Sequence, residues 1–503
     1  MLRSTIVKAL PGADIIAVSN REPYIHTRTA AGIVVQSPTS GLVAAIEPVM
    51  RACGGTWIAH GSGNADAEMV DAADRIMVPP ASPNYTLRRV WLSDEEQGGY
   101  YDGLANEGLW PFCHNVFLPT FRDGDWAYYR AVNARFAEAV VQEAKSADPI
   151  VLVQDYHFAL LPKMIRERLP EATIVTFWHI PWPSQETFGI FPWKAEIIEG
   201  LACSSVLGFH TQRYCEKFID TVDRFAESRI DRARGSIVVA DHETFVRPYP
   251  ISIEWPPPAL NSGQSVAACR ALVRTRFDLP AGVRLGVGIE RLDYTKGLLG
   301  RLRAIEDFLV RNPEWLGRFV FLQVAAPSRG RIAIYRKLEE DMREMVCEIN
   351  ARFGSDGYQP ISLISRRCEP QEVFELFRAA DFCMVSSLHE GMNLVAKEFV
   401  AARDDGLGVL ILSEFTGAAE ELSEALIVNP YDTNAIADAI SQALEMSEHE
   451  QGRRMGLMRG VVRSRNVYRW AGRMLLDAAQ CRQRSDYAVA KRGRGAASPA
   501  KLR

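Results

Sequence analysis

Short apolar runs alternate with amphipathic, helix-favouring stretches along nearly the whole chain. The runs cover residues 14–18, 57–63, 150–153, 173–177 and 205–209 in the first half, and 285–289, 319–325, 361–364, 381–385, 409–412 and 425–428 in the second. Runs of strand length that are apolar throughout are typical of parallel strands buried on both faces and joined by helices. The pattern therefore predicts an α/β protein with doubly wound sheets.

A proline-rich stretch at 254–258 interrupts this alternation, and a second series of strands and helices follows it. Such a change of composition marks a domain boundary. We predict a first domain at 1–253, a second at 254–470, and a basic disordered tail at 486–503, where Lys and Arg alternate with Gly, Ala, Ser and Pro. The segment before residues 40–42 has no periodicity, and we expect a mobile loop there.

Composition narrows the function classes. Of the 503 residues, 47% are hydrophobic and 24% charged, an ordinary globular mixture, and the net charge of -4 gives no reason to expect nucleic acid as a partner. The apolar runs are too short to span a membrane, and we expect no signal peptide. The nine cysteines are scattered without a Cys-x-x-Cys pair, which favours reduced thiols in the cytoplasm and indicates no zinc site.

The turn at 389–399, between an apolar run and a helix-favouring stretch, is the richest candidate site. Gly391 allows a ligand to approach the backbone, and Glu390 and Glu398 flank the helix start. The free backbone N–H groups there belong to Met392, Asn393 and Leu394. These groups favour a diphosphate, and the carboxylates can accept sugar hydroxyls, so we predict a nucleotide-sugar site. The alternative is an ordinary helix start with solvated acids.

Cations follow two other strands of the second half. Arg291 and Lys296 stand five residues apart in one predicted turn, and Arg329 stands in the next. An arginine fork and a lysine point charge together suit a diphosphate and offset the charge that builds on a departing nucleotide. No Gly-x-Gly-x-x-Gly or P-loop pattern follows any strand, which disfavours a dinucleotide oxidoreductase or a P-loop enzyme.

Polar residues also follow the strands of the first half. Asp155 and His179 end two of them, and Tyr101 and Trp110 flank a run of turn residues where they could line a pocket. Because parallel strands end at one edge of a sheet, we expect a shared crevice. A hydrogen-bonded structural role is the alternative for His179.

Taken together, the motifs resemble those of the glycosyltransferases of the trehalose-6-phosphate synthase family. The resemblance extends from Ser19-Asn20-Arg21 to about Arg473. Its other pieces are Tyr-Tyr-x-x-x-x-Asn-x-x-Leu-Trp-Pro at 100–111, Asp-Tyr-His at 155–157, His-Ile-Pro-Trp-Pro at 179–183, Glu-Arg-Leu-Asp-Tyr-Thr-Lys-Gly at 290–297, Ser-Arg-Gly at 328–330, Gly-Met-Asn-Leu-Val-Ala-Lys-Glu at 391–398 and Asn-Pro-Tyr-Asp at 429–432.

The resemblance implies a GT-B architecture, in which two Rossmann-like domains face each other across a cleft and a final helix, at 471–485, returns to the first domain. It implies transfer of glucose, with retention and without a metal or cofactor, from UDP-glucose to glucose 6-phosphate. The implied donor residues are Gly41, Arg291, Lys296, Gly391, Met392, Asn393, Leu394, Val395 and Glu398. The implied catalytic set is His179, Asp155, Arg291, Lys296 and Glu390.

The acceptor side carries over in the same way. The residues that match the acceptor group are Arg21, Tyr101, Trp110, Asp155 and Arg329. Three positions depart from the usual family pattern, which has Asp at Glu390, Gly at Ser40 and Trp at His60. Because His60 lies on the acceptor side, its departure bears on which acceptor the protein uses.

Two other functions stay open. A sister transferase could use another phosphorylated alcohol, such as glycerol 3-phosphate, because the same cations would hold its phosphate. A catalytically silent sensor of sugar phosphate is the more distant alternative, and the chemically able residues at every implied ligand position argue against it. Homo-oligomer formation is left open.

Overall fold

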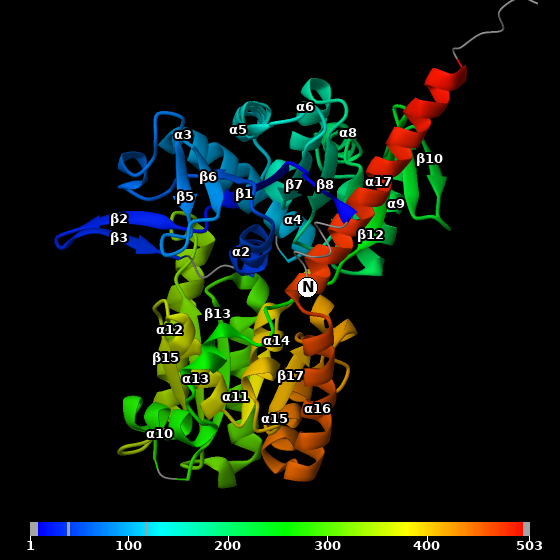
Figure 1. Ribbon diagram of the computed structural model, residues 1–503. Helices are drawn as coiled ribbons and strands as arrows, with labels where there is room; N and C mark the ends of the chain where they lie inside the picture. Colours follow the sequence, from blue (N-terminus) through cyan, green and yellow to red (C-terminus); the bar gives the residue numbers. More distant parts are fainter. Residues whose placement is uncertain (1–8, 38–40, 117, 281, 496–503) are drawn as a thin grey trace, which may run out of the picture.

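The computed structural model describes residues 9–37, 41–116, 118–280 and 282–495, without the side chains of 261, 262 and 485–495. Figure 1 shows two α/β layers, one above the other, built from the first and second halves of the chain. Ser40, one of the departures from the family pattern, lies outside the described residues.

The upper half is built on a ten-stranded sheet in the order β10-β11-β12-β9-β8-β7-β1-β4-β6-β5. Its strands are β1 (Ile15–Arg21), β4 (Thr56–His60), β5 (Arg75–Val78), β6 (Tyr85–Val90), β7 (Ile150–Gln154), β8 (Thr173–Phe177), β9 (Val206–Phe209), β10 (Ser228–Asp231), β11 (Ser236–Val239) and β12 (His242–Pro248). The central strands are parallel, and the antiparallel pairs, β5–β6, β10–β11 and β11–β12, lie at the edges. The predicted parallel strands are therefore confirmed.

Helices cover both faces of this sheet. They are α2 (Gly41–Cys53), α3 (Asp94–Glu96), the π-helix η2 (Gln97–Leu109), α4 (Trp110–His114), α5 (Asp123–Glu143), α6 (Leu161–Arg168), α7 (Gln185–Phe188), α8 (Lys194–Leu201) and α9 (Gln212–Phe225), with short 3-10 turns η1 (Asp66–Glu68) and η3 (Tyr156–Phe158). Because the sheet is covered on both sides, its central strands β7, β8 and β9 are buried throughout, which is why they are largely apolar without alternation.

The lower half is built on a fully parallel six-stranded sheet in the order β15-β14-β13-β16-β17-β18. Its strands are β13 (Arg284–Arg291), β14 (Phe319–Ala326), β15 (Ile361–Ile364), β16 (Phe382–Val385), β17 (Val409–Ser413) and β18 (Leu426–Val428). Its helices are α10 (Val266–Arg276), α11 (Leu298–Arg311), α12 (Ala333–Phe353), α13 (Pro370–Ala379), α14 (Leu394–Ala402), α15 (Thr433–Glu445) and α16 (Glu448–Ser464), with 3-10 turns η4 (Pro258–Ser262), η5 (Tyr294–Lys296), η6 (Pro313–Trp315) and η7 (Gly417–Glu420).

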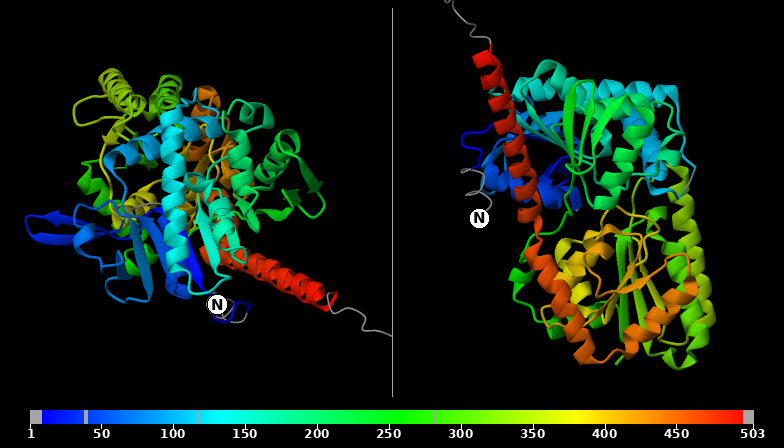
Figure 2. Two further views of the ribbon diagram at one scale, coloured as in Figure 1. Left: turned by 90° about the horizontal axis from the view of Figure 1, so that it is seen from above. Right: turned by 90° about the vertical axis from the view of Figure 1, so that its right-hand side faces the viewer.

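The final helix, α17 (Val467–Gly495), runs back from the lower half to the upper one, where it contacts β8, β9 and α2 (Figure 2). At this crossing the N–H of Val467 donates to the carbonyl oxygen of Ile253, 2.9 Å away, so the two segments that join the halves lie side by side. The domain boundaries at 253 and 470 stay predictions.

Two predictions about irregular segments were wrong. Residues 486–495 are helical rather than disordered, because Ala, Val, Lys and Arg sustain the helix until the glycines at its end; residues 496–503 of the predicted tail lie outside the described residues. The expected mobile loop contains an antiparallel hairpin of β2 (Ile25–Thr29) and β3 (Gly32–Gln36), whose β-branched residues favour strands.

Candidate active site

The turns at the carboxyl ends of the two sheets meet in one crevice. Trp110 Nε1 donates to Asp293 Oδ1 at 3.4 Å, which joins the start of α4 to the turn after β13. Tyr214 in α9 donates its hydroxyl to the carbonyl oxygen of Glu390 at 3.3 Å. The predicted turns therefore meet at the junction of the two halves, which we call the crevice.

The two glycines of the predicted donor site lie where segments of the two halves approach each other closely. A Cβ added to Gly391 would lie 2.7 Å from the carbonyl oxygen of His179. A Cβ added to Gly41, the first residue of α2, would lie 3.0 Å from Leu394 Cδ1. Both glycines thus lie where one half touches the other. At Gly391, where the neighbour is backbone, a larger side chain would hold the halves apart.

The turn after β16 leads into α14 as expected. Asn393 is the N-cap, and its side chain accepts the N–H of Ala396 at 2.8 Å. Met392 and Asn393 are buried, whereas the next residues, Leu394 and Val395, are partly exposed. The positive end of the α14 dipole, with its remaining N–H groups, therefore lies at the crevice, where a phosphate would be stabilised.

Glu390 is held by three donors. Lys296 Nζ contacts its carboxylate, and Ser387 Oγ and Asn393 Nδ2 donate to Oε2 at 2.8 and 2.9 Å. Burial would raise the pKa of Glu390, but Lys296 and these hydrogen bonds outweigh it and lower the pKa. Glu390 is therefore a fixed carboxylate, with Lys296 bound to it.

Glu398, by contrast, forms no ion pair among the described residues, and burial raises its pKa to about 7. A partly buried carboxyl group without a cation is available to accept hydrogen bonds from a ligand. This environment suits the predicted contact with ribose hydroxyls.

Cations gather on the acceptor side around two aromatic rings. Arg21 Nη2 donates to the Tyr101 hydroxyl at 3.2 Å. The Trp110 ring carries the guanidinium of Arg329 at 4.0 Å and that of Arg291 at 5.6 Å from its centroid. A guanidinium held over an indole ring keeps its positive charge at the ring, where it can attract an anion.

The electrostatic effect of this cluster is visible at Tyr101. Burial alone would raise the pKa of its phenol, but the charges of Arg21, Arg329 and Arg291 outweigh burial and lower the pKa to about 8. Positive potential strong enough to acidify a buried phenol also attracts an anionic ligand. The cluster therefore forms an anion site before any ligand arrives.

Asp155 lies where the sequence placed it, directly after β7, in a strained backbone conformation. Its φ of 79° is in the left-handed region, and its Oδ1 accepts the N–H groups of Tyr156 at 2.9 Å and His179 at 3.2 Å. Arg329 also has a positive φ, of 50°. Strain of this kind in non-glycine residues concentrates at functional sites, and here both residues belong to the predicted acceptor group.

His179 is oriented by a residue that the sequence did not single out. Its Nε2 lies 2.9 Å from the Oε1 of buried Gln154, the last residue of β7. Burial lowers the pKa of His179 well below its ordinary value, so the ring is neutral. Because a carboxamide oxygen only accepts, Nε2 carries the proton and Nδ1 is left as an acceptor.

Asp293 is a second residue that sequence reasoning missed. Its fully buried carboxylate lies 3.2 Å from Arg329 Nη1, which also donates to the Tyr335 hydroxyl at 2.6 Å. Burial would raise the pKa of Asp293, but Arg329, Arg291 and Lys296 outweigh it and lower the pKa. Asp293 stands between Arg291 and Lys296 in the sequence, so its place in that turn was the available signal.

His60 ends β4 beside Arg21 of β1, and its Nδ1 lies 3.1 Å from the carbonyl oxygen of Val90. Burial lowers the pKa of His60. The residue that departs from the family pattern therefore borders the acceptor-side cations, as expected.

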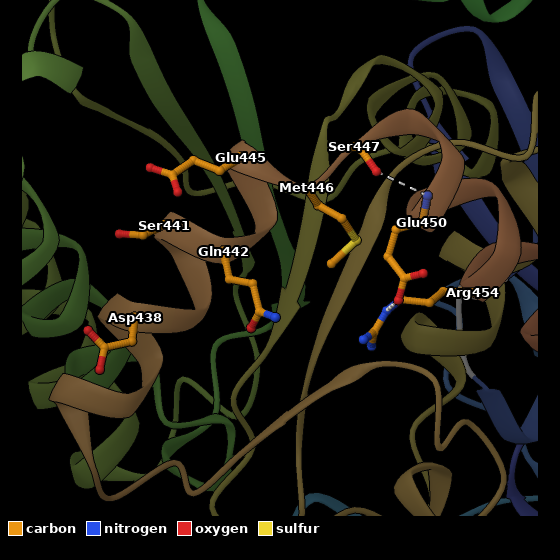
Figure 3. Close-up of a pocket in the computed structure, with 8 residues that line it drawn as sticks. All are labelled: Asp438, Ser441, Gln442, Glu445, Met446, Ser447, Glu450 and Arg454. Carbon is orange, nitrogen blue, oxygen red and sulfur yellow. Dashed lines mark hydrogen bonds and ion pairs between the residues drawn. The ribbon is translucent and has the colours of Figure 1, made fainter.

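A cavity of about 580 Å³ lies at the α15–α16 junction, where Glu445 and Glu450 line it, and it contains none of the predicted site residues (Figure 3). Among the described residues there is no group of three or more His, Cys, Asp or Glu placed to hold a metal ion, and no helix long and apolar enough to cross a membrane.

Two α/β sheets whose strand ends face one crevice lined with cations and carboxylates define a GT-B glycosyltransferase. The model of glycosyltransferase family 20 matches residues 13–480, and the chain belongs to this family.

Proteins with similar sequences belong to the same family. A trehalose-6-phosphate synthase from Mycolicibacterium vanbaalenii is 38% identical over 478 residues, which cover 93% of this chain and 96% of that protein. A bifunctional trehalose-6-phosphate synthase/phosphatase from Thermoproteus tenax is 36% identical, and the match covers 91% of this chain but only 62% of that longer protein.

Solved structures of this family are similar in fold. One from E. coli, bound with UDP-2-fluoro glucose, has a TM-score of 0.81 at 30% identity and covers 93% of this chain and 99% of its own. A UDP-forming trehalose-phosphate synthase from Burkholderia xenovorans, in complex with glucose-6-phosphate, has a TM-score of 0.82 at 29% identity and covers 92% and 99%.

Proposed function

We propose that the chain is an α,α-trehalose-6-phosphate synthase, which transfers glucose with retention from UDP-glucose to glucose 6-phosphate and releases UDP. The observation that carries the proposal is the cluster of Arg21 and Arg329 with Tyr101 and Trp110. A sugar phosphate brings a dianion, which such a cluster binds strongly. The names of the relatives and the glucose-6-phosphate bound in a similar structure support the same acceptor.

On the donor side, we assign the diphosphate to Arg291, Lys296 and the start of α14, and the ribose to Glu398. Lys296 and Glu390 form an ion pair, so the transferred sugar can bind to Glu390 while Lys296 faces the phosphates. The UDP-2-fluoro glucose in a similar structure supports a UDP-glucose donor. Positive charge at the leaving diphosphate stabilises the transition state, and no metal or cofactor is part of the proposal.

Retention is best explained without a covalent intermediate. A covalent route needs a free carboxylate under the anomeric carbon. Glu390 is held by Lys296, Ser387 and Asn393, and Glu398 is assigned to the ribose. Asp155 accepts two backbone N–H groups and belongs to the other half. We therefore propose that the acceptor hydroxyl attacks on the face that the phosphate leaves, and that the departing phosphate oxygen takes its proton. A similar structure is described in terms of glycosyl transfer with retention.

Glycerol 3-phosphate is the second candidate acceptor, because the arginine cluster binds a phosphate and not a whole sugar. The specific observation is His60, which borders the cluster beside Arg21. The two proposed substrates are charged metabolites, and the nine cysteines are free thiols, so a cytoplasmic location is part of the proposal.

The deciding experiment is an acceptor panel with UDP-glucose, read as release of UDP. Glucose 6-phosphate should give the fastest release, glycerol 3-phosphate little, and unphosphorylated glucose almost none. Faster release with glycerol 3-phosphate would establish the sister transferase instead. No release with any acceptor, at concentrations where glucose 6-phosphate binds, would establish a sensor.

A further inference from the structure

A second cavity lies on the upper half, away from the crevice residues. It has a volume of about 610 Å³ and is bounded by α9, the turn between β10 and β11, β12 and α17, which lie together in the right part of Figure 1. This volume is in the range of small-molecule sites. Four arginines and one carboxylate provide its charged lining, namely Arg232, Arg234, Arg247, Arg484 and Glu216.

Three of these arginines surround one ring. The guanidinium carbons of Arg234, Arg247 and Arg484 lie 5.6, 5.1 and 5.0 Å from the centroid of the buried Phe245 ring. Each cation gains from the ring, but the three repel one another at this spacing. The cluster therefore concentrates positive charge at one wall of the cavity.

Among the described residues, only two of these four arginines have a carboxylate partner. Arg232 pairs with Asp220 and Asp223, and Arg234 pairs with Glu243 at 3.4 Å. Within the side chains that the structure describes, neither Arg247 nor Arg484 has an ion-pair partner. Two guanidiniums thus face the cavity without a counter-ion from the described part of the chain.

Arg247 is also held in position. Its Nη1 donates to the carbonyl oxygens of Arg234 at 2.7 Å and Gly235 at 2.9 Å, on the turn between β10 and β11. Fixing one nitrogen of the fork leaves the others at a defined angle to the cavity, which lowers the entropy lost on binding a ligand. A built cation of this kind differs from a mobile surface arginine.

We propose that this cavity is a second anion site, which takes a phosphorylated small molecule. Arg247 provides the fixed fork, Arg484 closes on the phosphate from α17, and Arg234 adds charge beside them. Guanidiniums bind phosphate oxygens in pairs of parallel hydrogen bonds, which suits this arrangement. None of these arginines belongs to the crevice, so this site and the proposed acceptor site are separate.

The test is calorimetric titration of the full-length chain with pyrophosphate. Because the crevice can also bind this anion, the cavity is identified as the one equivalent of binding that responds to substitution of its arginines. The variant Arg247→Gln/Arg484→Gln should bind at least about tenfold more weakly, because charged hydrogen bonds are lost. The matched control is Arg469→Gln, which removes an exposed charge from the same helix about 22 Å away.

Turnover should be unchanged in all of these variants, so the test does not depend on the proposed reaction. The single variant Arg484→Gln changes an exposed side chain, so the test stays valid if the double variant does not fold. Arg484→Gln should weaken pyrophosphate binding several-fold. Equal binding by the unchanged protein and Arg484→Gln, or no binding of pyrophosphate by the unchanged protein, would overturn the proposal.

Discussion

A Cβ on Gly391 would lie 2.7 Å from the carbonyl oxygen of His179 and 2.8 Å from His210 Cδ2, although Gly391 and the two histidines belong to different sheets. The halves can therefore close to this distance only because residue 391 has no side chain. Closure also brings the predicted donor turn against the turn that carries His179. The absence of one methyl group thus sets how closely donor and acceptor can meet.

Gly391→Ala should lower turnover roughly tenfold to a hundredfold, because a displacement of about 1 Å at the reacting centre has costs of that order. The fold should persist, since the clash lies between the halves. The checks are steady-state kinetics and thermal unfolding. Gly456→Ala is the control, because a Cβ there meets nothing within 4 Å. Unchanged turnover in Gly391→Ala would mean that closure to this distance is not needed.

Arg291→Ala and Lys296→Ala should each lower turnover at least about tenfold, because each removes positive charge from the leaving diphosphate. Arg303→Ala, on the exposed face of α11, is the matched control and should be near normal. The measurement is the rate of UDP release at saturating substrates. Near-normal rates in both site variants would refute the donor assignment.

Arg329→Ala should raise the KM for glucose 6-phosphate far more than that for UDP-glucose, since one charged hydrogen bond to a phosphate contributes roughly 1.5 to 3 kcal/mol. Because Arg329 also balances buried Asp293, thermal unfolding should be measured alongside. Arg329→Lys keeps the charge and should restore part of the affinity. A larger effect on the donor KM would place Arg329 elsewhere.

The pH dependence of acceptor binding should reflect Tyr101, whose pKa is lowered to about 8. Below pH 8 the phenol is protonated and can donate to a phosphate. Above pH 8 it ionises, and the phenolate repels the phosphate, so the KM for glucose 6-phosphate should rise. Tyr101→Phe should bind the acceptor more weakly at pH 7 but lose this rise. A rise that persists in the phenylalanine variant would have another origin.

Activity should survive EDTA, because Arg291, Lys296 and the start of α14 provide the positive potential that a metal would otherwise supply. The measurement is UDP release before and after chelation, with magnesium or manganese added back. Loss of activity on chelation, followed by recovery with either metal, would contradict this expectation.

Sequence patterns identified the strands because burial on both faces leaves a strong signal. The apolar run at 173–177 coincides with β8, and the run at 361–364 coincides with β15. The hairpin at 25–36 was missed because it packs no continuous apolar run into a core. The helix past residue 485 was missed because its charges resemble those of a disordered tail.

Part of the site was predictable because its residues follow strands that the sequence identifies. Residues such as Asp155 and Arg291 stand directly after strands, where a crevice must lie. Their partners could not be predicted from one sequence, because the contacts of Gln154 with His179 and of Asp293 with Arg329 depend on which turns meet in space. The roles of the site residues in binding and catalysis stay predictions until the variants are measured.

The two segments that join the halves lie side by side, bonded from Val467 to Ile253. A single linker would allow the halves to twist and slide as well as to swing. Two adjacent linkers restrict the relative motion of the halves to a hinge rotation about one axis. Closure about one axis would bring the donor and the acceptor to the same relative alignment in every turnover. A reaction that takes place on one face of the sugar requires this alignment.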